Sequence, residues 1–448
     1  MNAQEINYSS QKTAEHLINK IANDKILKFV IVAMLLSYFY NLPFIKYSLT
    51  GSNELRIYDV AGVFVIYYLY IYNKLLRFVI KITKPFKWLW MFLLYASFMI
   101  LVTLFFFIYF DAAIYFIQAV LYLYHFYVFF FTAVFLYVIC FKKSNLFFFL
   151  QTILIFSSAC CTVVILQNFD LIPFLWNDLY LRSYAGFLSG TLGPNKIVLG
   201  MTSLIMFCLS VGLLIEKDIK VNKFLNLLAI LLNIYIILIS GSRTTYVALM
   251  VFLMFFSIFK TSKFILFGSF FITISLSISV LNNTIYTKIE DVINQRITGK
   301  VRNKNNISNQ KVGDLYEDLG SGRDQLAKSN AMFLLENPYI IPFGVGFNNW
   351  SIGGLGLSAH NMYLQVIKEL GLVGFVLYFG WLLNYFFIDF KQFKGFAIAL
   401  RGLVLAMLVT LFFGEHLYIY RPVFAILGLF LAVSVLFLSI LHNNERND

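Results

Sequence analysis

A small set of arginine and histidine residues could do chemistry in a sequence that is otherwise strongly apolar. Guanidinium groups hold the oxygens of a pyrophosphate as a two-pronged fork and neutralise the charge that grows on a leaving group. A neutral imidazole can take a proton from a hydroxyl near neutral pH. Together these residue types suit a reaction between a polyanionic donor and a nucleophilic hydroxyl. The residues are Arg182, Arg243, Arg323 and His360.

Each arginine also has a plainer interpretation. Arg243 lies in Ser240–Thr245, a tight connection between two apolar runs, where it either binds an anion near the start of the next helix or reaches the lipid headgroups. Arg182 lies in a longer connection and is either a ligand or an ordinary loop residue. Arg323 either binds an anion or pairs with Asp324 at the start of a predicted helix. All three are candidate pyrophosphate ligands, and Arg243 and Arg323 are also candidate catalytic groups.

His360 is the sharpest candidate among the five histidines. It lies in Ser358–Leu364, directly before an apolar run, where it either acts on a hydroxyl or caps the start of a helix. His125 lies within an apolar run and is interpreted as a packed core residue. His416 lies between two runs, where an interfacial role is favoured over a place in the site. The candidate accessory residues are Asn361, Tyr363, His416 and Arg421.

The sequence offers no obvious site for a metal or an organic cofactor. It has no Asp-x-Asp pair in the predicted outer connections, no cluster of His and Cys, no glycine-rich nucleotide loop and no Gly-x-Ser-x-Gly elbow. The four cysteines all lie in apolar runs and lack the spacing of metal ligands. We therefore expect chemistry that uses no metal and no cofactor.

The elements that must position these residues are membrane-spanning helices. Of 448 residues, 60% are hydrophobic and 13% are charged, with a mean hydropathy of +0.78. Ordinary soluble domains have roughly 25% charged residues, so this composition excludes a soluble globular protein. Because a spanning helix needs about 20 apolar residues, we expect an all-α polytopic membrane protein with about twelve transmembrane helices. The apolar runs are 27–45, 57–73, 89–110, 114–141, 146–166, 196–215, 224–240, 244–259, 264–281, 365–388, 396–413 and 422–441.

Charges in the connecting segments predict which side of the membrane each segment faces. The formal net charge is +13. With a cytoplasmic N-terminus, 19 of the 35 basic residues fall on the cytoplasmic side, whereas the short outward connections hold six. The reverse orientation breaks the positive-inside rule. We therefore expect both termini in the cytoplasm, and the net charge requires no nucleic acid partner.

Two outward connections are longer than the topology requires. One is 167–195, and the other, 282–364, has the size of a loop that carries function. We predict residues 1–281 to contain transmembrane helices 1 to 9, residues 282–364 to form a large outer loop with short helices, and residues 365–448 to contain helices 10 to 12. The three arginines and His360 then all lie on the outer side. ATP and nucleotide sugars are absent there, which favours a lipid-linked pyrophosphate as donor.

Several short motifs occur in a set order between about residues 180 and 390. They are Arg182–Asn195, Ser240–Arg243, Ser321–Gln325, Glu336–Pro338, Phe343–Trp350, Ala359–Gln365 and Glu369–Phe375. In this order and spacing they resemble the shared region of bacterial O-antigen ligases and Wzy-type O-antigen polymerases. The match is specific to that superfamily rather than to one member, and the Arg182 segment is its least distinctive part.

The resemblance implies a metal-independent, inverting glycosyltransferase of the GT-C type in the bacterial inner membrane, with its site on the periplasmic side. Such enzymes transfer a glycan from undecaprenyl pyrophosphate to a hydroxyl. By motif match, Arg182, Arg243 and Arg323 would hold the pyrophosphate. His360 would serve as general base or orient the acceptor. The implied partners are the undecaprenyl-pyrophosphate-linked donor and acceptor, membrane lipid and a chain-length regulator.

The acceptor distinguishes the two activities of the superfamily. A polymerase extends another undecaprenyl-linked repeat, whereas a ligase transfers the glycan to lipid A-core. The stretches Asn41–Ser48 and Asn53–Asp59 look more like polymerases from surface-polysaccharide clusters, so we favour an O-antigen or surface-polysaccharide polymerase.

Two functions from other classes stay open. A flippase for lipid-linked oligosaccharides predicts ionisable groups deep inside several helices. The clearest interior candidates are His125 and Arg401, with Lys368 and Glu369 near the start of a helix. A scaffold that regulates chain length would have little need for an outer set of arginines and a histidine.

Overall fold

The computed structural model describes most of the predicted helices and none of residues 260–322. The described residues are 17–42, 45–46, 54–110, 113–173, 175, 190–193, 195–216, 219, 221–259, 323–388, 393–418 and 424–442. Within them the fold is all-α, apart from a two-residue antiparallel ladder in which β1 (Ile45–Lys46) pairs with β2 (Glu54–Leu55).

The helices fall on the predicted apolar runs. Each run overlaps a helix, except 264–281, which lies outside the described residues. The 3₁₀ helices η1 (Pro338–Ile340) and η2 (Gly354–Gly356) lie between α14 and α15. The α-helices are α2 (Lys25–Ser37), α3 (Ile57–Ile82), α4 (Lys84–Phe110), α5 (Ala113–Ile139), α6 (Lys143–Asn168), α8 (Lys196–Ile215), α9 (Lys223–Ile239), α10 (Arg243–Phe259), α14 (Arg323–Glu336), α15 (Met362–Asn384), α16 (Lys394–Thr410) and α17 (Phe424–His442).

Six of the described helices are long and apolar enough to cross a membrane: α3, α4, α5, α6, α8 and α15. The helices α9 and α10 and residues Ala425–Ile440 of α17 are shorter and apolar. The chain is therefore a polytopic membrane protein. The predicted twelve passes would require these three helices, α2, α16 and the run 264–281, which lies outside the described residues, to cross as well.

Two helices end elsewhere than their apolar runs predict. The first run extends to residue 45, but α2 ends at Ser37. Beyond it, the Asn41 backbone N–H donates to the Thr191 carbonyl at 2.8 Å, whereas in a continued helix it would donate to a carbonyl four residues earlier. In contrast, helical structure in α3 continues past the predicted end to Ile82, across a kink at Tyr72, which has φ −109° and ψ 23°. The residues after the kink include lysine and arginine, which are good helix formers.

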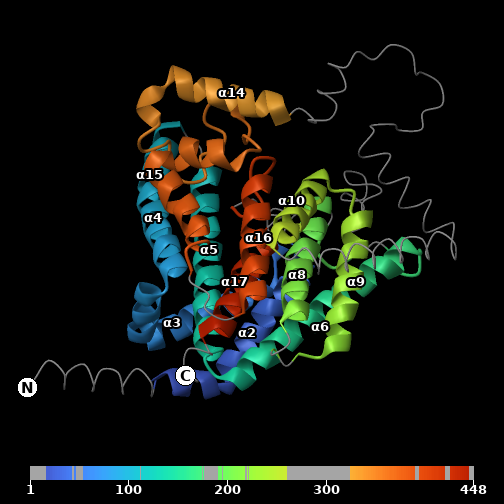
Figure 1. The fold of residues 1–448 in the computed structure, drawn as a ribbon. Helices are drawn as coiled ribbons and strands as arrows, with labels where there is room; N and C mark the ends of the chain where they lie inside the picture. Colours follow the sequence, from blue (N-terminus) through green and yellow to red (C-terminus); the bar gives the residue numbers. More distant parts are fainter. Residues whose placement is uncertain are drawn as a thin grey trace, which may run out of the picture.

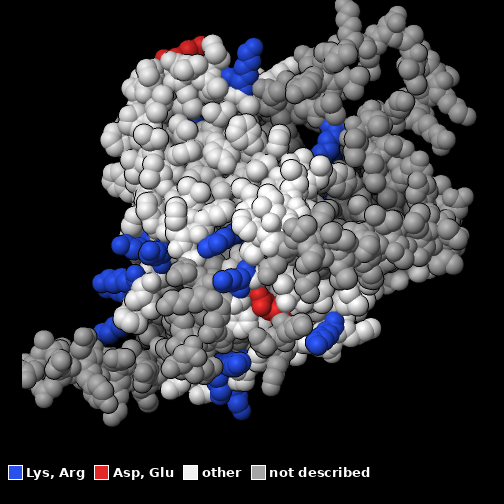
Figure 2. Space-filling view, viewed as in Figure 1, with Lys and Arg blue, Asp and Glu red and all other residues white. Residues whose placement is uncertain are grey.

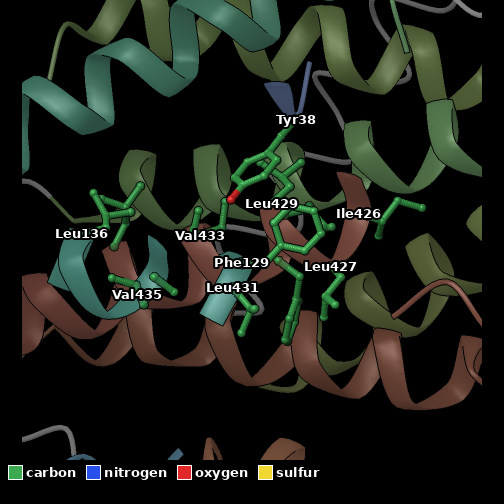
Figure 3. Close-up of a cluster of buried hydrophobic side chains, with 14 of the residues drawn as sticks. Tyr38, Phe129, Leu136, Ile426, Leu427, Leu429, Leu431, Val433 and Val435 are labelled. Atoms are coloured by element: carbon green, nitrogen blue, oxygen red, sulfur yellow. The ribbon is translucent and has the colours of Figure 1, made fainter. Parts of the chain in front are cut away.

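The central helix of the bundle is α17. Its residues from Ala425 to Ile440 are all buried, as expected for a helix that is apolar on every side. Figure 3 shows α17 side chains such as Leu429 and Val433 beside Tyr38 and Phe129. Tyr38 directly follows α2, and Phe129 belongs to α5. The rings of Tyr38 and Phe129 meet edge to face, with centroids 5.7 Å apart. This contact is part of one continuous buried core, to which every described α-helix except α14 contributes.

Contacts of α8 establish which helix ends lie together. Near its start, a Cβ added to Gly200 would collide with the Thr245 side chain in the first turn of α10. At its other end, Glu216 Oε1 accepts a hydrogen bond from the Gly395 N–H, at the start of α16, at 2.8 Å. Since α16 begins at this second end, Thr410 at its C-terminus lies at the same end of the bundle as the start of α10.

The two ends of the bundle differ in character. Helix α14 lies across one end, and α17 terminates toward the other (Figure 1). Figure 2 shows that basic side chains on the face in view gather toward the end away from α14. We call these the α14 end and the basic end. Exposed lysines at the starts of α6, α9 and α16 are Lys143, Lys223 and Lys394.

Residues 323–361, which we call the cap, are packed onto the α14 end. A small hydrophobic cluster holds the cap in place. Leu334, Ile340 and Val345 are buried in it, with Phe106 of α4 and Leu364 of α15 packed against them. The cap is therefore attached to two membrane helices. The predicted division of the chain at residues 281 and 364 stays a prediction.

Candidate functional site

The cap enters the bundle where α15 is broken. Gly371 has φ +65° and ψ −169°, a conformation open essentially to glycine alone. The break frees backbone carbonyls within a candidate membrane span, where each must find a partner. The Val345 N–H donates to the Lys368 carbonyl at 2.9 Å. The next amide, of Gly346, donates to the Glu369 carbonyl at 2.9 Å.

The side chains of Lys368 and Glu369 are almost completely buried at this break, at 0% and 1% exposure. A buried ammonium requires partners. The Lys368 Nζ donates to Asn330 Oδ1 in α14 at 2.5 Å and to the Trp350 carbonyl at 2.7 Å. Lys368 therefore ties both α14 and the loop that follows it to α15.

Glu369 gathers donors from three directions. Its Oε2 accepts from the Asn348 N–H and from the Tyr418 hydroxyl, each at 2.9 Å. Its Oε1 accepts from Gln365 Nε2, one turn earlier in α15. Burial raises the pKa of Tyr418 well above its ordinary value, so that hydroxyl stays protonated and able to donate. Glu369 thus joins the cap, α15 and the connection between α16 and α17.

Gln365 extends this network to the backbone beside His360. Its Oε1 accepts from the Ala359 N–H at 3.0 Å. His360 itself has φ +47°, in the left-handed region that few residues other than glycine adopt. Its N–H donates to Ser358 Oγ at 3.3 Å, and the Ser358 hydroxyl in turn donates to Glu415 Oε1. The backbone around His360 is therefore held from two sides.

The start of α15 is also joined to the end of α16. Asn361 caps α15, because its Oδ1 accepts from the Tyr363 N–H at 3.0 Å. The Tyr363 hydroxyl donates to the Leu408 carbonyl at 2.8 Å. His416 is buried just beyond, with Nε2 at 2.7 Å from the Thr410 hydroxyl. The three predicted accessory residues that are described all lie in this junction.

Arg243 is the first residue of α10 and is half-buried. The turn before it is built from small polar residues. Ser242 Oγ accepts from the Thr245 hydroxyl at 2.9 Å and lies 3.4 Å from the Thr245 N–H. This N-terminal capping by Ser242 leaves the other backbone amides of the first turn of α10 directed out of the helix start.

The packing of α10 on α16 places Arg243 near the level of the His360 junction. A Cβ added to Gly402 of α16 would lie 3.0 Å from the ring of Phe252 in α10. The two helices are antiparallel, so eight residues further toward the α14 end lie Thr410 in one helix and Thr244 in the other. Arg243 and the end of α16 therefore share one end of the bundle.

The structure thus brings three segments that contain predicted site residues to the α14 end: Ser240–Thr245, Ser358–Tyr363 and Thr410–His416. Arg182 and Arg421 lie outside the described residues. Arg323 begins α14, and only its backbone is described. A shared pyrophosphate site of the three arginines therefore stays a prediction.

The role of the buried network was not predicted from the sequence. Lys368 and Glu369 were interpreted only as interior candidates for a transport path, and Gln365 was not singled out. A signal was present, because polar residues at 365, 368 and 369 have the spacing of one helix face within an apolar run. The neighbouring sequence did not indicate a role for Glu415, because its hydrogen-bond partner Ser358 lies 57 positions earlier.

These features define a class: a polytopic membrane protein in which a cap is docked onto a broken helix. Residues 228–379, which include α10, α14 and most of α15, match the family model described as O-antigen ligase. The chain therefore carries an O-antigen ligase domain, and the resemblance seen in the motifs is confirmed. Members of this family are enzymes that transfer glycans, as polymerases or ligases, and use lipid-linked glycans. A comparison with curated proteins finds no match to the chain.

Proposed function

We propose that this protein is a surface-polysaccharide polymerase of the bacterial inner membrane. It transfers a growing glycan from undecaprenyl pyrophosphate to the non-reducing end of another undecaprenyl-pyrophosphate-linked repeat at the periplasmic face. The O-antigen ligase domain supports glycan transfer from a lipid-linked donor. The basic residues of the connections support an orientation with the basic end in the cytoplasm and the α14 end in the periplasm. In this proposal about twelve helices cross the membrane in a GT-C arrangement.

The proposed reaction is an inverting substitution that uses no metal. The acceptor hydroxyl oxygen attacks the anomeric carbon of the donor glycan, and the bond from that carbon to the pyrophosphate oxygen breaks. The hydroxyl proton passes to His360, and undecaprenyl pyrophosphate leaves with the bonding electrons. Arg182, Arg243 and Arg323 neutralise the charge on the departing group.

One observation carries this proposal. The Arg243 turn, the His360 junction and the connection from Thr410 to His416 share the α14 end of the bundle. The first two segments also lie within the O-antigen ligase domain. A cation and a proton acceptor at one end of a membrane domain suit an anionic leaving group and an attacking hydroxyl.

The decisive experiment supplies purified protein in lipid vesicles with undecaprenyl-linked repeats, with and without lipid A-core. We expect ladders of longer lipid-linked glycans without lipid A-core. Transfer that occurs only when lipid A-core is added would identify a ligase. Movement of labelled repeats across the vesicle membrane without any lengthening would identify a flippase.

Arg243→Lys should slow chain extension by about tenfold to a hundredfold. Lysine keeps the charge but loses the fork that holds two phosphate oxygens at once. The extension rate of protein in vesicles, normalised to inserted protein, measures the effect. Arg77→Lys is the matched control, because Arg77 is exposed on α3 near the basic end and should be insensitive. Full activity of Arg243→Lys would instead mean that Arg243 only anchors the helix at the lipid headgroups.

A further inference from the structure

A continuous chain of hydrogen bonds runs along α15 from its break to the backbone beside His360. It starts at Glu369, passes through Gln365 one turn earlier and ends at the Ala359 N–H. We propose that Glu369 and Gln365 are positioning residues that hold His360 for the transfer reaction. The activity part of this inference rests on the proposed function, whereas the position of residue 360 can be measured independently.

The donor and acceptor inventory allows only one arrangement of this chain. The Ala359 N–H can only donate, so the Gln365 atom that faces it must be the amide oxygen. The Gln365 amide nitrogen then faces Glu369 Oε1, which must accept. The other Glu369 oxygen faces the Asn348 N–H, which also can only donate. Glu369 must therefore present an acceptor on both sides, as a carboxylate does and an amide does not.

His360, next to the end of this chain of hydrogen bonds, has a backbone conformation that its surroundings must hold in place. His360 lies in the left-handed region, and such conformations persist where the surroundings hold them. The bond from Ala359 to Gln365 holds the preceding amide, and the Ser358 hydroxyl, itself bonded to Glu415, holds the amide of His360. Both supports come from outside the loop of His360, because Gln365 lies within α15 and Glu415 lies beyond α16.

The Glu369 carboxylate is also hydrogen-bonded to the cap and to the connection between α16 and α17. Glu369 accepts from Asn348 in the cap and from Tyr418 in that connection. Glu369 is 1% exposed and Gln365 is 2% exposed, so water cannot readily replace a lost partner. A change at Glu369 is therefore transmitted to residue 360 rather than absorbed by solvent.

The chain can be tested by exchanging its two members. Glu369→Gln alone places an amide N–H against either Gln365 Nε2 or the Asn348 N–H, so one link breaks. Gln365→Glu alone places two carboxyl groups against each other, and at a pH where both are ionised their repulsion breaks the link. The double variant Gln365→Glu, Glu369→Gln restores every bond. Its carboxylate at position 365 accepts from Ala359 and from the amide nitrogen at position 369, while the amide oxygen at position 369 accepts from Asn348 and Tyr418.

For activity, each single variant should lower kcat for chain extension by about tenfold to a hundredfold, with a smaller change in KM, because misplacing a reacting group by about 1 Å has effects of that size. The double variant should recover close to the wild-type kcat. The kcat is measured per inserted protein, so a merely destabilised fold would lower the amount of inserted protein and not kcat. Singles that extend chains at the wild-type rate, or an inserted double variant as impaired as the singles, would overturn the proposal.

A second measurement follows residue 360 itself. His360→Cys is introduced into the wild-type, single-variant and double-variant chains, and its labelling rate with a membrane-impermeant maleimide is measured in vesicles. The four native cysteines are buried, so their background labelling is low. We expect the labelling rate to change several-fold in each single variant and to return in the double variant. Arg77→Lys, at an exposed position of α3 away from this network, should label like the wild type.

The two measurements separate the possible failures. If the wild-type protein extends no chains, the proposed function fails, and the labelling rates alone decide whether Glu369 and Gln365 position residue 360. If a single variant does not insert, the double variant decides: wild-type activity and labelling support the proposal, and loss of either overturns it. Equal labelling in all backgrounds also overturns it.

Discussion

His360→Ala should lower the rate of glycan chain extension by at least about a hundredfold, which is the contribution of a positioned general base. In the proposed reaction His360 takes the proton of the attacking sugar hydroxyl, and alanine cannot. The protein should still insert, because the helix that follows is capped by Asn361 and not by the imidazole. The measurement is the length distribution of lipid-linked glycans on a gel, at matched amounts of inserted protein.

His360→Asn separates the chemistry from the backbone conformation. Asparagine adopts the left-handed region more readily than most residues, so it preserves φ near +47° without supplying a base. Both variants should therefore lose extension to a similar degree. Long chains made by His360→Asn would show that His360 acts only through the shape of its loop.

Gly371→Ala should destabilise the folded protein by about 3 kcal/mol or more. The observed φ and ψ are strained for any residue with a Cβ, at a cost of about 1 to 3 kcal/mol. A Cβ would also collide with the Pro342 carbonyl and lie 2.5 Å from the Phe343 nitrogen. These are backbone atoms that cannot rotate away, so overpacking adds about 1 to 3 kcal/mol. We expect a lower Tm in detergent and a lower yield of monodisperse protein.

Gly356→Ala is the matched control for this prediction. Gly356 also has a positive φ, of +67°, but the nearest atom to an added Cβ is the Ser351 carbonyl oxygen at 3.8 Å. The substitution should therefore cost only the conformational strain, about 1 kcal/mol. Equal losses of Tm in the two variants would show that the close approach of the cap to α15 contributes nothing to stability.

Much of the fold follows from local composition. Apolar runs in the sequence predict helices because lipid offers the backbone no other partners, and the described part of the chain bears this out for every run except 264–281, which it does not cover. The same reasoning identified the segments around Arg243 and His360, because a charge or an imidazole at the end of an apolar run is conspicuous. The order of the short motifs also identified the O-antigen ligase domain.

The break of α15 did not follow from the sequence. Gly371 lies within the predicted run 365–388, and a single glycine is tolerated in many helices. Its special conformation exists because the backbone of the cap, at Val345 and Gly346, replaces the helical hydrogen bonds. Those partners lie about 25 positions away, so no local window of sequence contains the information.

The sequence by itself determined that this is a polytopic membrane protein, which segments form its helices and which few polar residues could do chemistry, because hydropathy and charge are properties of single residues and their neighbours. Only the tertiary structure decided what the buried polar residues do. Glu369 joins Gln365 to Asn348 and Tyr418, and Ser358 meets Glu415. Hydrogen bonds depend on distance and direction in space, and these partners come from separate elements that meet only when the bundle and its cap are assembled.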